Sequence, residues 1–249
     1  MKIIIQNLAI EYSDEGQGPV MLMIHGWGDS LHTFDKLIPA LVAQRRIVRI
    51  DLPGFGKSET PKETWNLNNY VMCVKNFVEK MNLRVDTLVG HSLGGRIIIK
   101  GEAEGMLTAR KNILIASAGV AKRRTVRNVI VRIAAKIGKI VLYIPPFIFW
   151  RTKLRRKFYA RIGSDYLDAG MLRETFLAII KEDLSRSASK ITLPSLLIWG
   201  REDTSTPLEE GRRMNDLIKG SILEIVEGAG HFVHQEKSEE VARLINHFV

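Results

Sequence analysis

Short apolar runs and longer amphipathic stretches alternate along most of the chain. The apolar runs predict buried strands near residues 20–25, 46–51, 85–90, 112–117, 196–200 and 222–226. Helical spacing predicts helices near 32–43 and 67–82, and a further helix directly after residue 92. Residues 1–12 are typical of an antiparallel edge hairpin. Strands that alternate with helices favour an α/β fold, with a mostly parallel central sheet flanked by helices.

The alternation stops between residues 119 and 190, where the pattern is helical throughout. The strand and helix rhythm resumes at Thr192-Leu193-Pro194 and continues to the end of the chain. We therefore predict a core domain made of residues 1–118 and 191–249, with residues 119–190 forming an all-helical insertion between two strands.

Positive charge is concentrated in this insertion. Residues 119–190 hold 17 basic and 5 acidic side chains, whereas the rest of the chain holds 20 basic and 22 acidic ones. An amphipathic helix is predicted before Pro145-Pro146, with an apolar stripe and many cations around it. The stripe consists of Val126, Ile130, Ile133, Ile137, Ile140 and Ile144, and the cations are Arg123, Arg124, Arg127, Arg132, Lys136 and Lys139.

Three interpretations of this basic insertion stay open. It is a lid whose cations are solvated, a surface that attracts anionic lipid, or a surface that attracts acidic substrates. Residues 147–158 mix aromatic side chains with cations, as interfacial segments do. Nucleic acid is not expected as a partner, because no recognition motif accompanies the charge.

Composition adds an expectation about location. The chain has 249 residues, of which 45% are hydrophobic, as is ordinary for a soluble globular protein. Its opening residues, Met1 to Asn7, turn polar too early for a signal peptide. The single cysteine, Cys73, cannot form an internal disulfide and is expected to be buried, so we expect a cytoplasmic protein.

The most informative motif is Gly90-His91-Ser92-Leu93-Gly94-Gly95, which joins a predicted strand to a predicted helix. A G-x-S-x-G pattern in this context is typical of a nucleophile elbow. A serine at the tip of so tight a turn has a strained backbone, and only very small residues on either side let the strand and the helix pass closely.

Further residues follow the ends of other predicted strands. His25-Gly26-Trp27-Gly28 closes the run near 20–25, Arg201-Glu202-Asp203 follows that near 196–200, and Gly228-Ala229-Gly230-His231 follows that near 222–226. Serine, then acid, then histidine is the triad order of the α/β-hydrolases. With the loop-like segment Asp51 to Ser58, the chain resembles the α/β-hydrolase superfamily over nearly its whole length, close in pattern to capped bacterial esterases, lipases and C–C hydrolases.

The resemblance implies a role for each of these residues. Ser92 would be the nucleophile, His231 the general base, and Asp203 the residue that orients the imidazole. The backbone N–H groups of Trp27 and Leu93 would form the oxyanion hole. Residues 119–190 would be the cap. Asp203 is preferred over Glu202 because it stands three residues after Gly200, and His231 is preferred over His234 because glycines mark its loop.

The serine narrows the expected reaction to carboxylic ester hydrolysis through an acyl-enzyme, with a small-molecule ester or other acyl compound as substrate. Hydrolysis of a C–C bond in a vinylogous diketone acid, or acyl transfer to an alcohol, thiol or peroxide, would use the same triad. A non-catalytic binding protein with this fold is the alternative from another class. No metal cluster, phosphate-binding loop or nucleotide fingerprint is present in the sequence, so no cofactor is expected.

Overall fold

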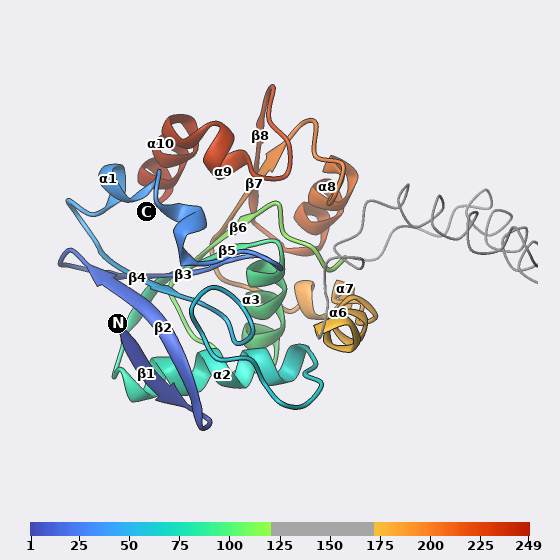
Figure 1. Ribbon diagram of the computed structural model, residues 1–249. Helices are drawn as coiled ribbons and strands as arrows, with labels where there is room; N and C mark the ends of the chain where they lie inside the picture. The colour runs from blue at the N-terminus through green and yellow to red at the C-terminus, as the bar shows by residue number, and fades with distance from the viewer. Residues whose placement is uncertain (121–171) are drawn as a thin grey trace, which may run out of the picture. The chain divides into compact units, whose positions relative to one another are not determined.

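The computed structural model of the chain describes residues 1–120 and 172–249. They form an eight-stranded sheet in the order β1-β2-β4-β3-β5-β6-β7-β8, with helices on both faces (Figure 1). The strands are β1 (Lys2–Ile5), β2 (Leu8–Glu15), β3 (Val20–Ile24), β4 (Arg46–Ile50), β5 (Val85–His91), β6 (Lys111–Ile115), β7 (Ser195–Gly200) and β8 (Ile222–Val226). The helices are α1 (Ile38–Leu41), α2 (Leu67–Lys80), α3 (Leu93–Ala103), α6 (Arg173–Ile180), α7 (Ser185–Ala188), α8 (Leu208–Leu217), α9 (Val233–Glu236) and α10 (Ser238–Phe248).

Strand directions confirm the predicted fold class. Strand β2 pairs antiparallel with both β1 and β4, which gives the expected edge hairpin. Every other neighbouring pair, from β4 to β8, is parallel. The carboxyl ends of these parallel strands therefore meet at one edge of the sheet, which is where ligands bind in open α/β sheets.

Both faces of the sheet are buried under helices, and the central strands are apolar for that reason. All five residues of β3 are buried. Leu22 and Ile24 belong to the hydrophobic cluster beneath α2, α3 and α8, whereas Met21 and Met23 belong to the cluster beneath α1, α9 and α10. Cys73 of α2 lies in the first cluster and is fully buried, as expected.

One predicted helix differs from the structure. Instead of a single helix near 32–43, there are two short pieces, a 3₁₀ helix at Leu31–Phe34 and α1. The bonds across the junction run from the N–H of Leu37 to the carbonyl of Phe34 and from Ile38 to Asp35, with 3₁₀ spacing. Pro39 supplies the reason, since a proline lacks an N–H and its ring clashes with the carbonyl four residues earlier in a continuous helix.

Residues 172–190 pack on the sheet domain, and the described residues, 1–120 and 172–249, belong to one compact unit. The buried guanidinium of Arg96 on α3 donates Nη2–H bonds to the carbonyls of Ile179 and Glu182, both at 2.6 Å. The N–H of Trp65 donates to the hydroxyl of Thr175 at 3.0 Å. These bonds hold α6 and the segment after it against α3 and against the residues just before α2.

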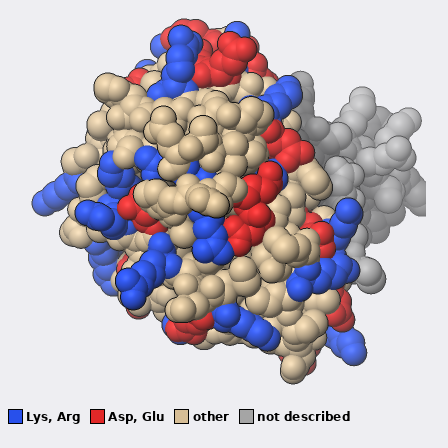
Figure 2. Space-filling model, turned by 90° about the vertical axis from the view of Figure 1, so that its left-hand side faces the viewer, with Lys and Arg blue, Asp and Glu red and all other residues tan. Residues whose placement is uncertain are grey.

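The predicted basic helix of residues 123–144 and the aromatic segment 147–158 lie outside the described residues. The division into a core of 1–118 and 191–249 and a cap of 119–190 stays a prediction. The face shown in Figure 2 has basic and acidic side chains interspersed around uncharged residues. Among the described helices, none is both long enough and apolar enough to cross a bilayer.

Candidate active site

Ser92 lies at the turn between β5 and α3, and its backbone is strained. Its φ is +49° and its ψ is −104°, in a region that favours glycine. A residue held in this way costs about 1–3 kcal/mol and persists only where its surroundings fix it. Here the N–H of Ser92 donates to the carbonyl of Ile115 at 3.0 Å, and its carbonyl accepts from the N–H of Ala118 at 3.3 Å.

The glycines around Ser92 are required by close backbone contacts, as the sequence predicts. A Cβ on Gly90 would lie 2.5 Å from the carbonyl carbon of Gly94. A Cβ on Gly94 would lie 2.0 Å from the carbonyl oxygen of Ile24, at the end of β3. The elbow is therefore held against both its own strand and the neighbouring one by distances that no larger residue allows.

His231 and Asp203 are brought together from the loops after β8 and β7. The Nδ1 atom of His231 lies 2.8 Å from Oδ2 of Asp203, and the Asp203 side chain is fully buried. Because a carboxylate only accepts hydrogen bonds, Nδ1 carries the proton, and Nε2 of the neutral ring keeps a free lone pair. Glu202, the rival acid, is exposed. The side chain of His231 is 15% exposed, so its ring is reachable from outside the core.

Ser92 and His231 are connected through the turn at the end of β6. The hydroxyl of Thr206 contacts the carbonyl of Ala116 at 3.1 Å and Nδ1 of His231 at 3.2 Å. Residues 115 and 118 of the same turn bond the backbone of Ser92. No hydrogen bond joins the Ser92 hydroxyl to another residue in the two described ranges, and catalytic hydrogen bonds are often long before substrate binds.

The loop after β3 is ordered by a buried histidine. Nδ1 of His25 donates to the carbonyl of Gly26 at 2.6 Å, and Nε2 accepts from the N–H of Leu52 at 2.9 Å. One donor and one acceptor nitrogen define a neutral ring, and burial correspondingly lowers the pKa of His25. His25 therefore orders its loop and does not exchange a proton.

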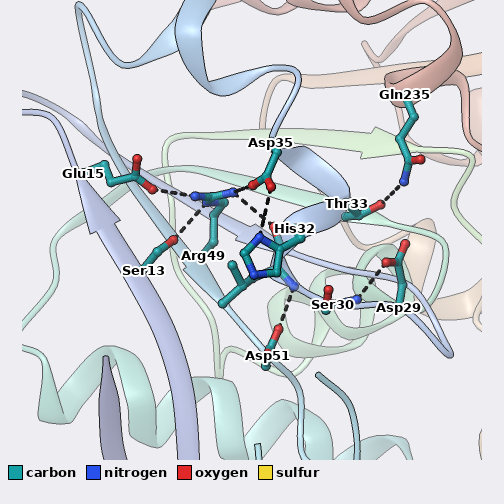
Figure 3. A network of polar contacts seen from close by, with 11 residues as sticks. Ser13, Glu15, Asp29, Ser30, His32, Thr33, Asp35, Arg49, Asp51 and Gln235 are labelled. Atoms are coloured by element: carbon teal, nitrogen blue, oxygen red, sulfur yellow. Dashed lines mark hydrogen bonds and ion pairs between the residues drawn. The ribbon is translucent and has the colours of Figure 1, made fainter. Parts of the chain in front are cut away.

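Arg49 of β4 and Asp51, which follows that strand, also bond residues of the segment between β3 and β4. The guanidinium of Arg49 donates to the hydroxyl of Ser13 at 2.9 Å and pairs with the carboxylates of Asp35 and Glu15 (Figure 3). One oxygen of Asp51 accepts from the N–H of Leu31 at 2.6 Å.

The other carboxylate oxygen of Asp51 accepts from the N–H of Lys57 at 2.7 Å. A Cβ on Gly56 would lie 2.0 Å from that same oxygen, so the turn must carry a glycine there. Asp51 thus ties the loop after β3 to the loop after β4, which accounts for the Asp51 to Ser58 segment singled out in the sequence.

The two predicted oxyanion-hole donors are Trp27, in the loop after β3, and Leu93, at the start of α3. Within the described parts of the chain, the N–H groups of Trp27 and Leu93 have no hydrogen-bond acceptor. Leu93 is the first residue of α3, where N–H groups are free for an anion. The indole of Trp27 packs between Phe55 and Phe176, each with a centroid distance of 4.9 Å, and forms an aromatic wall.

Two buried histidines, His91 and His234, lie close to His231 in the interior of the protein. Nε2 of His91 donates to the carbonyl of His231 at 3.1 Å, and the His91 ring lies 4.8 Å from that of His231 and 4.4 Å from that of His234. Burial, with the neighbouring histidines, holds the pKa of His91 well below its ordinary value. Burial likewise lowers the pKa of His234 to about 3. Both rings are therefore neutral and unsuited to proton transfer at neutral pH.

The contact between His91 and the loop of His231 was not predicted from the sequence. The contacts of Thr206 were not predicted either. These contacts join residues 140 and 25 positions apart, and no local pattern signals them. The side chains of His32 and His247 are exposed, away from this cluster of histidines. Among the described residues, no group of three or more histidine, cysteine or acidic side chains is arranged to hold a metal ion.

Comparison with known proteins adds to this geometry. Residues 21–244 match the model of the alpha/beta hydrolase family. A pimeloyl-[acyl-carrier protein] methyl ester esterase from Neisseria meningitidis is 28% identical over 91% of this chain and 92% of its own length.

Two other similarities cover almost all of the chain. A 2-hydroxy-6-oxo-2,4-heptadienoate hydrolase from Pseudomonas putida is 26% identical over 95% of this chain and 91% of its own length. The crystal structure of a membrane phospholipase A matches with a TM-score of 0.77 and 25% identity, covering 100% of this chain and 84% of that one.

Proposed function

The chain belongs to the alpha/beta hydrolase family, and we propose that it hydrolyses carboxylic esters of small molecules with Ser92, His231 and Asp203 as its catalytic triad. The observation that carries this proposal is the 2.8 Å contact between His231 Nδ1 and the buried carboxylate of Asp203. That contact leaves Nε2 of the ring free to act as a base, at the same sheet edge as the strained turn of Ser92.

The proposed reaction has two halves. Ser92 Oγ attacks the ester carbonyl carbon while Nε2 of His231 takes its proton, and Asp203 stabilises the resulting imidazolium. The N–H groups of Leu93 and Trp27 donate to the negative oxygen of the tetrahedral intermediate. His231 then protonates the leaving alcohol. Water, activated by the same imidazole, attacks the acyl-enzyme and releases the carboxylic acid and Ser92.

Several observations support an ester as substrate. The aromatic wall of Trp27, Phe55 and Phe176 offers an apolar surface beside the proposed oxyanion hole. Phe232, whose ring lies 5.5 Å from that of His231, is 42% exposed and extends this apolar character. The similarity to a methyl ester esterase points to the same chemistry.

C–C bond hydrolysis is a second candidate, and one similarity favours it. The relative from Pseudomonas putida is named as a heptadienoate hydrolase, and that reaction would require the same triad. Acyl transfer to an alcohol, thiol or peroxide differs only in the acceptor that attacks the acyl-enzyme. A panel of nitrophenyl esters with short, long and acidic acyl groups, assayed beside a vinylogous diketone acid and with added alcohol acceptors, separates these activities.

The Ser92→Ala variant tests the proposed triad. We expect ester turnover to fall by several orders of magnitude, because the nucleophile is lost. The melting temperature should stay close to that of the parent, because alanine keeps the Cβ and the Ser92 hydroxyl makes no hydrogen bond within the described residues. Ser187→Ala on α7 is the matched control and should keep parental turnover. Turnover of Ser92→Ala within about tenfold of the parent would exclude Ser92 as nucleophile.

The same variant separates an enzyme from a non-catalytic binding protein of this fold. A fluorophosphonate probe reacts with an activated serine, so it should label the parent and fail to label Ser92→Ala. A parent protein that neither hydrolyses any ester of the panel nor reacts with the probe would favour the binding protein.

Location and membrane contact belong to the same proposal. A buried thiol at Cys73, the single cysteine of the chain, suits the reducing cytoplasm. The excess of cations in residues 119–190, and the similarity to a membrane phospholipase A, support peripheral contact with anionic lipid. Co-sedimentation with anionic liposomes at low salt, lost at high salt, is the expected result. Absence of binding at low salt would remove lipid from the proposal.

A further inference from the structure

Thr206 occupies the point where the proposed acid and base meet. It lies in the loop between β7 and α8 and is 5% exposed. Its hydroxyl oxygen is 2.8 Å from Oδ2 of Asp203 and 3.2 Å from Nδ1 of His231. Since Nδ1 and Oδ2 are themselves 2.8 Å apart, the three atoms form a closed triangle.

The protons in this triangle can be assigned from donor and acceptor chemistry. The carboxylate of Asp203 only accepts, so the hydroxyl of Thr206 and Nδ1 of His231 both donate to its Oδ2. The other oxygen, Oδ1, accepts from the N–H groups of Ser205 at 2.8 Å and Thr206 at 2.9 Å. Four donors saturate a carboxylate, which has about four lone-pair sites. Thr206 supplies two of the four, one from its backbone and one from its side chain.

Thr206 also reaches the part of the chain that holds the nucleophile. Its one hydroxyl proton points chiefly to Oδ2 of Asp203 at 2.8 Å, and the carbonyl oxygen of Ala116, at 3.1 Å, is the second and weaker acceptor of a three-centre bond. Ala116 has a φ of +44°, which is strained for a residue other than glycine. Ile115, directly before Ala116, and Ala118, two residues after it, both bond the backbone of Ser92. One hydroxyl therefore touches the acid, the base and the turn that carries the nucleophile.

The backbone of Thr206 is held by a further hydrogen bond. Its carbonyl accepts from the indole Nε1 of Trp199, a fully buried residue of β7, at 2.8 Å. The ring of Trp199 is in turn confined by Gly211 of α8, where a Cβ would lie 2.7 Å from the indole. Because both its backbone and its hydroxyl are hydrogen-bonded, Thr206 can define the position of its partners.

We propose that Thr206 is a positioning residue, whose hydroxyl aligns Asp203 and His231 with the turn that carries Ser92. The proposal rests on the proposed triad and adds a residue to it. The hydroxyl fixes the rotation of the Asp203 carboxylate about its χ2 torsion, and through it the plane of the imidazole. A misaligned general base costs rate in the chemical step and leaves substrate binding unchanged.

Substitutions that separate the hydroxyl from the methyl group of Thr206 test this role. Thr206→Val keeps the shape and removes the hydroxyl, whereas Thr206→Ser keeps the hydroxyl and removes the methyl group. We expect Thr206→Val to lower kcat by about 10- to 100-fold with KM nearly unchanged, and Thr206→Ser to restore most of kcat. Thr204→Val, the same change at an exposed neighbour, is the matched control.

Thermal melting of each variant accompanies the kinetics. If Thr206→Val does not fold, Thr206→Ala replaces it in the comparison with Thr206→Ser. A parental kcat in the variant without the hydroxyl would overturn the proposal. Equal losses in Thr206→Val and Thr206→Ser would also overturn it, because packing of the methyl group would then explain both.

A second measurement keeps this test independent of the proposed function. The Nδ1 proton of His231 should give a low-field NMR resonance, identified by its absence in His231→Gln. We expect the resonance in the parent and in Thr206→Ser, and expect it broadened by exchange or shifted in Thr206→Val. If the parent hydrolyses no ester, the proposed function fails. The proposal for Thr206 is tested separately by the resonance, and an unchanged resonance in Thr206→Val would overturn it.

Discussion

The two halves of the candidate site are held in place by different forces. The nucleophile side, formed by β5, α3 and the end of β3, is held by backbone contacts that require Gly90 and Gly94. The acid and base side, formed by the loops after β7 and β8, is held by side-chain hydrogen bonds among Asp203, Thr206 and His231. Close backbone packing distinguishes the nucleophile side, and side-chain hydrogen bonds distinguish the acid and base side.

This difference separates the consequences of substitution. A larger residue on the nucleophile side collides with backbone that cannot move without disturbing the sheet, so folding and activity should fail together. On the acid and base side, an isosteric change removes a proton or a charge and leaves the packing intact, so activity should fail while the fold survives. The predictions below test this contrast.

The largest effect is expected for Gly94→Ala. The new Cβ would lie 2.0 Å from the carbonyl oxygen of Ile24, and overpacking of this kind costs about 3 kcal/mol, a large part of the stability of an ordinary domain. We expect a strongly lowered melting temperature and little soluble, active protein. Gly105→Ala, just after the same helix, is the control, with a φ of +69° but no atom within 4 Å of its Cβ. It should cost only about 1 kcal/mol. Equal melting temperatures for the two variants would contradict the steric account.

Asp203→Asn should affect the rate and spare the fold. The amide presents a donor where His231 needs an acceptor, so we expect kcat to fall by about 10⁴-fold, by analogy with triad acids elsewhere. Its neighbour Glu202 is exposed, and Glu202→Gln should change kcat little. Steady-state kinetics on one nitrophenyl ester, with melting curves, compare the two variants. Mild and equal losses in both would refute this placement of the acid.

The smallest effect concerns the far end of α3, where Glu102 lies. Burial raises the pKa of its carboxyl to about 7, although the amide of Asn112 donates to it at 2.6 Å. The ordinary pKa of a glutamate carboxyl is 4.5, so rising pH ionises the carboxyl in the unfolded chain first. The stability that depends on the neutral carboxyl is therefore fully present below pH 4.5, falls between pH 4.5 and 7, and stays low above pH 7.

Glu102→Gln removes this ionisation and should raise the melting temperature at pH 8 more than at pH 5. Unfolding in urea at the two pH values measures the difference. The exposed Glu63→Gln serves as control and should show no such dependence on pH. If Glu102→Gln shifts stability equally at both pH values, the buried carboxyl does not carry a penalty when it ionises.

Much of the sheet domain could be predicted from local pattern, and the exceptions are instructive. The strands of the parallel sheet were predicted to within a few residues, because both faces are buried and the runs are continuously apolar. The prediction of one continuous helix near 32–43 was wrong, because Pro39 interrupts it despite the helical spacing of its apolar residues.

In the candidate site, loops that follow parallel strands meet at one edge, so Asp203 and His231 could be paired from their order in the chain. The contacts of Thr206 and His91 with the loops of Asp203 and His231 could not be predicted from the sequence. A threonine or a histidine beside a motif has many partners available, and only packing selects one. His91 reaches the carbonyl of His231 across 140 positions of sequence.

The sequence by itself determined the alternation of strands and helices, the elbow at Ser92 and the strand ends that carry Asp203 and His231. Those features depend on apolar periodicity and on glycines, which act within a few residues of one another. Only the tertiary structure decided that the hydroxyl of Thr206 joins the acid, the base and the turn beside Ser92, and that the carboxyl of Glu102 has a buried oxygen. Those outcomes depend on which loops are brought together when the sheet forms, because these hydrogen bonds and this burial involve residues distant in the chain.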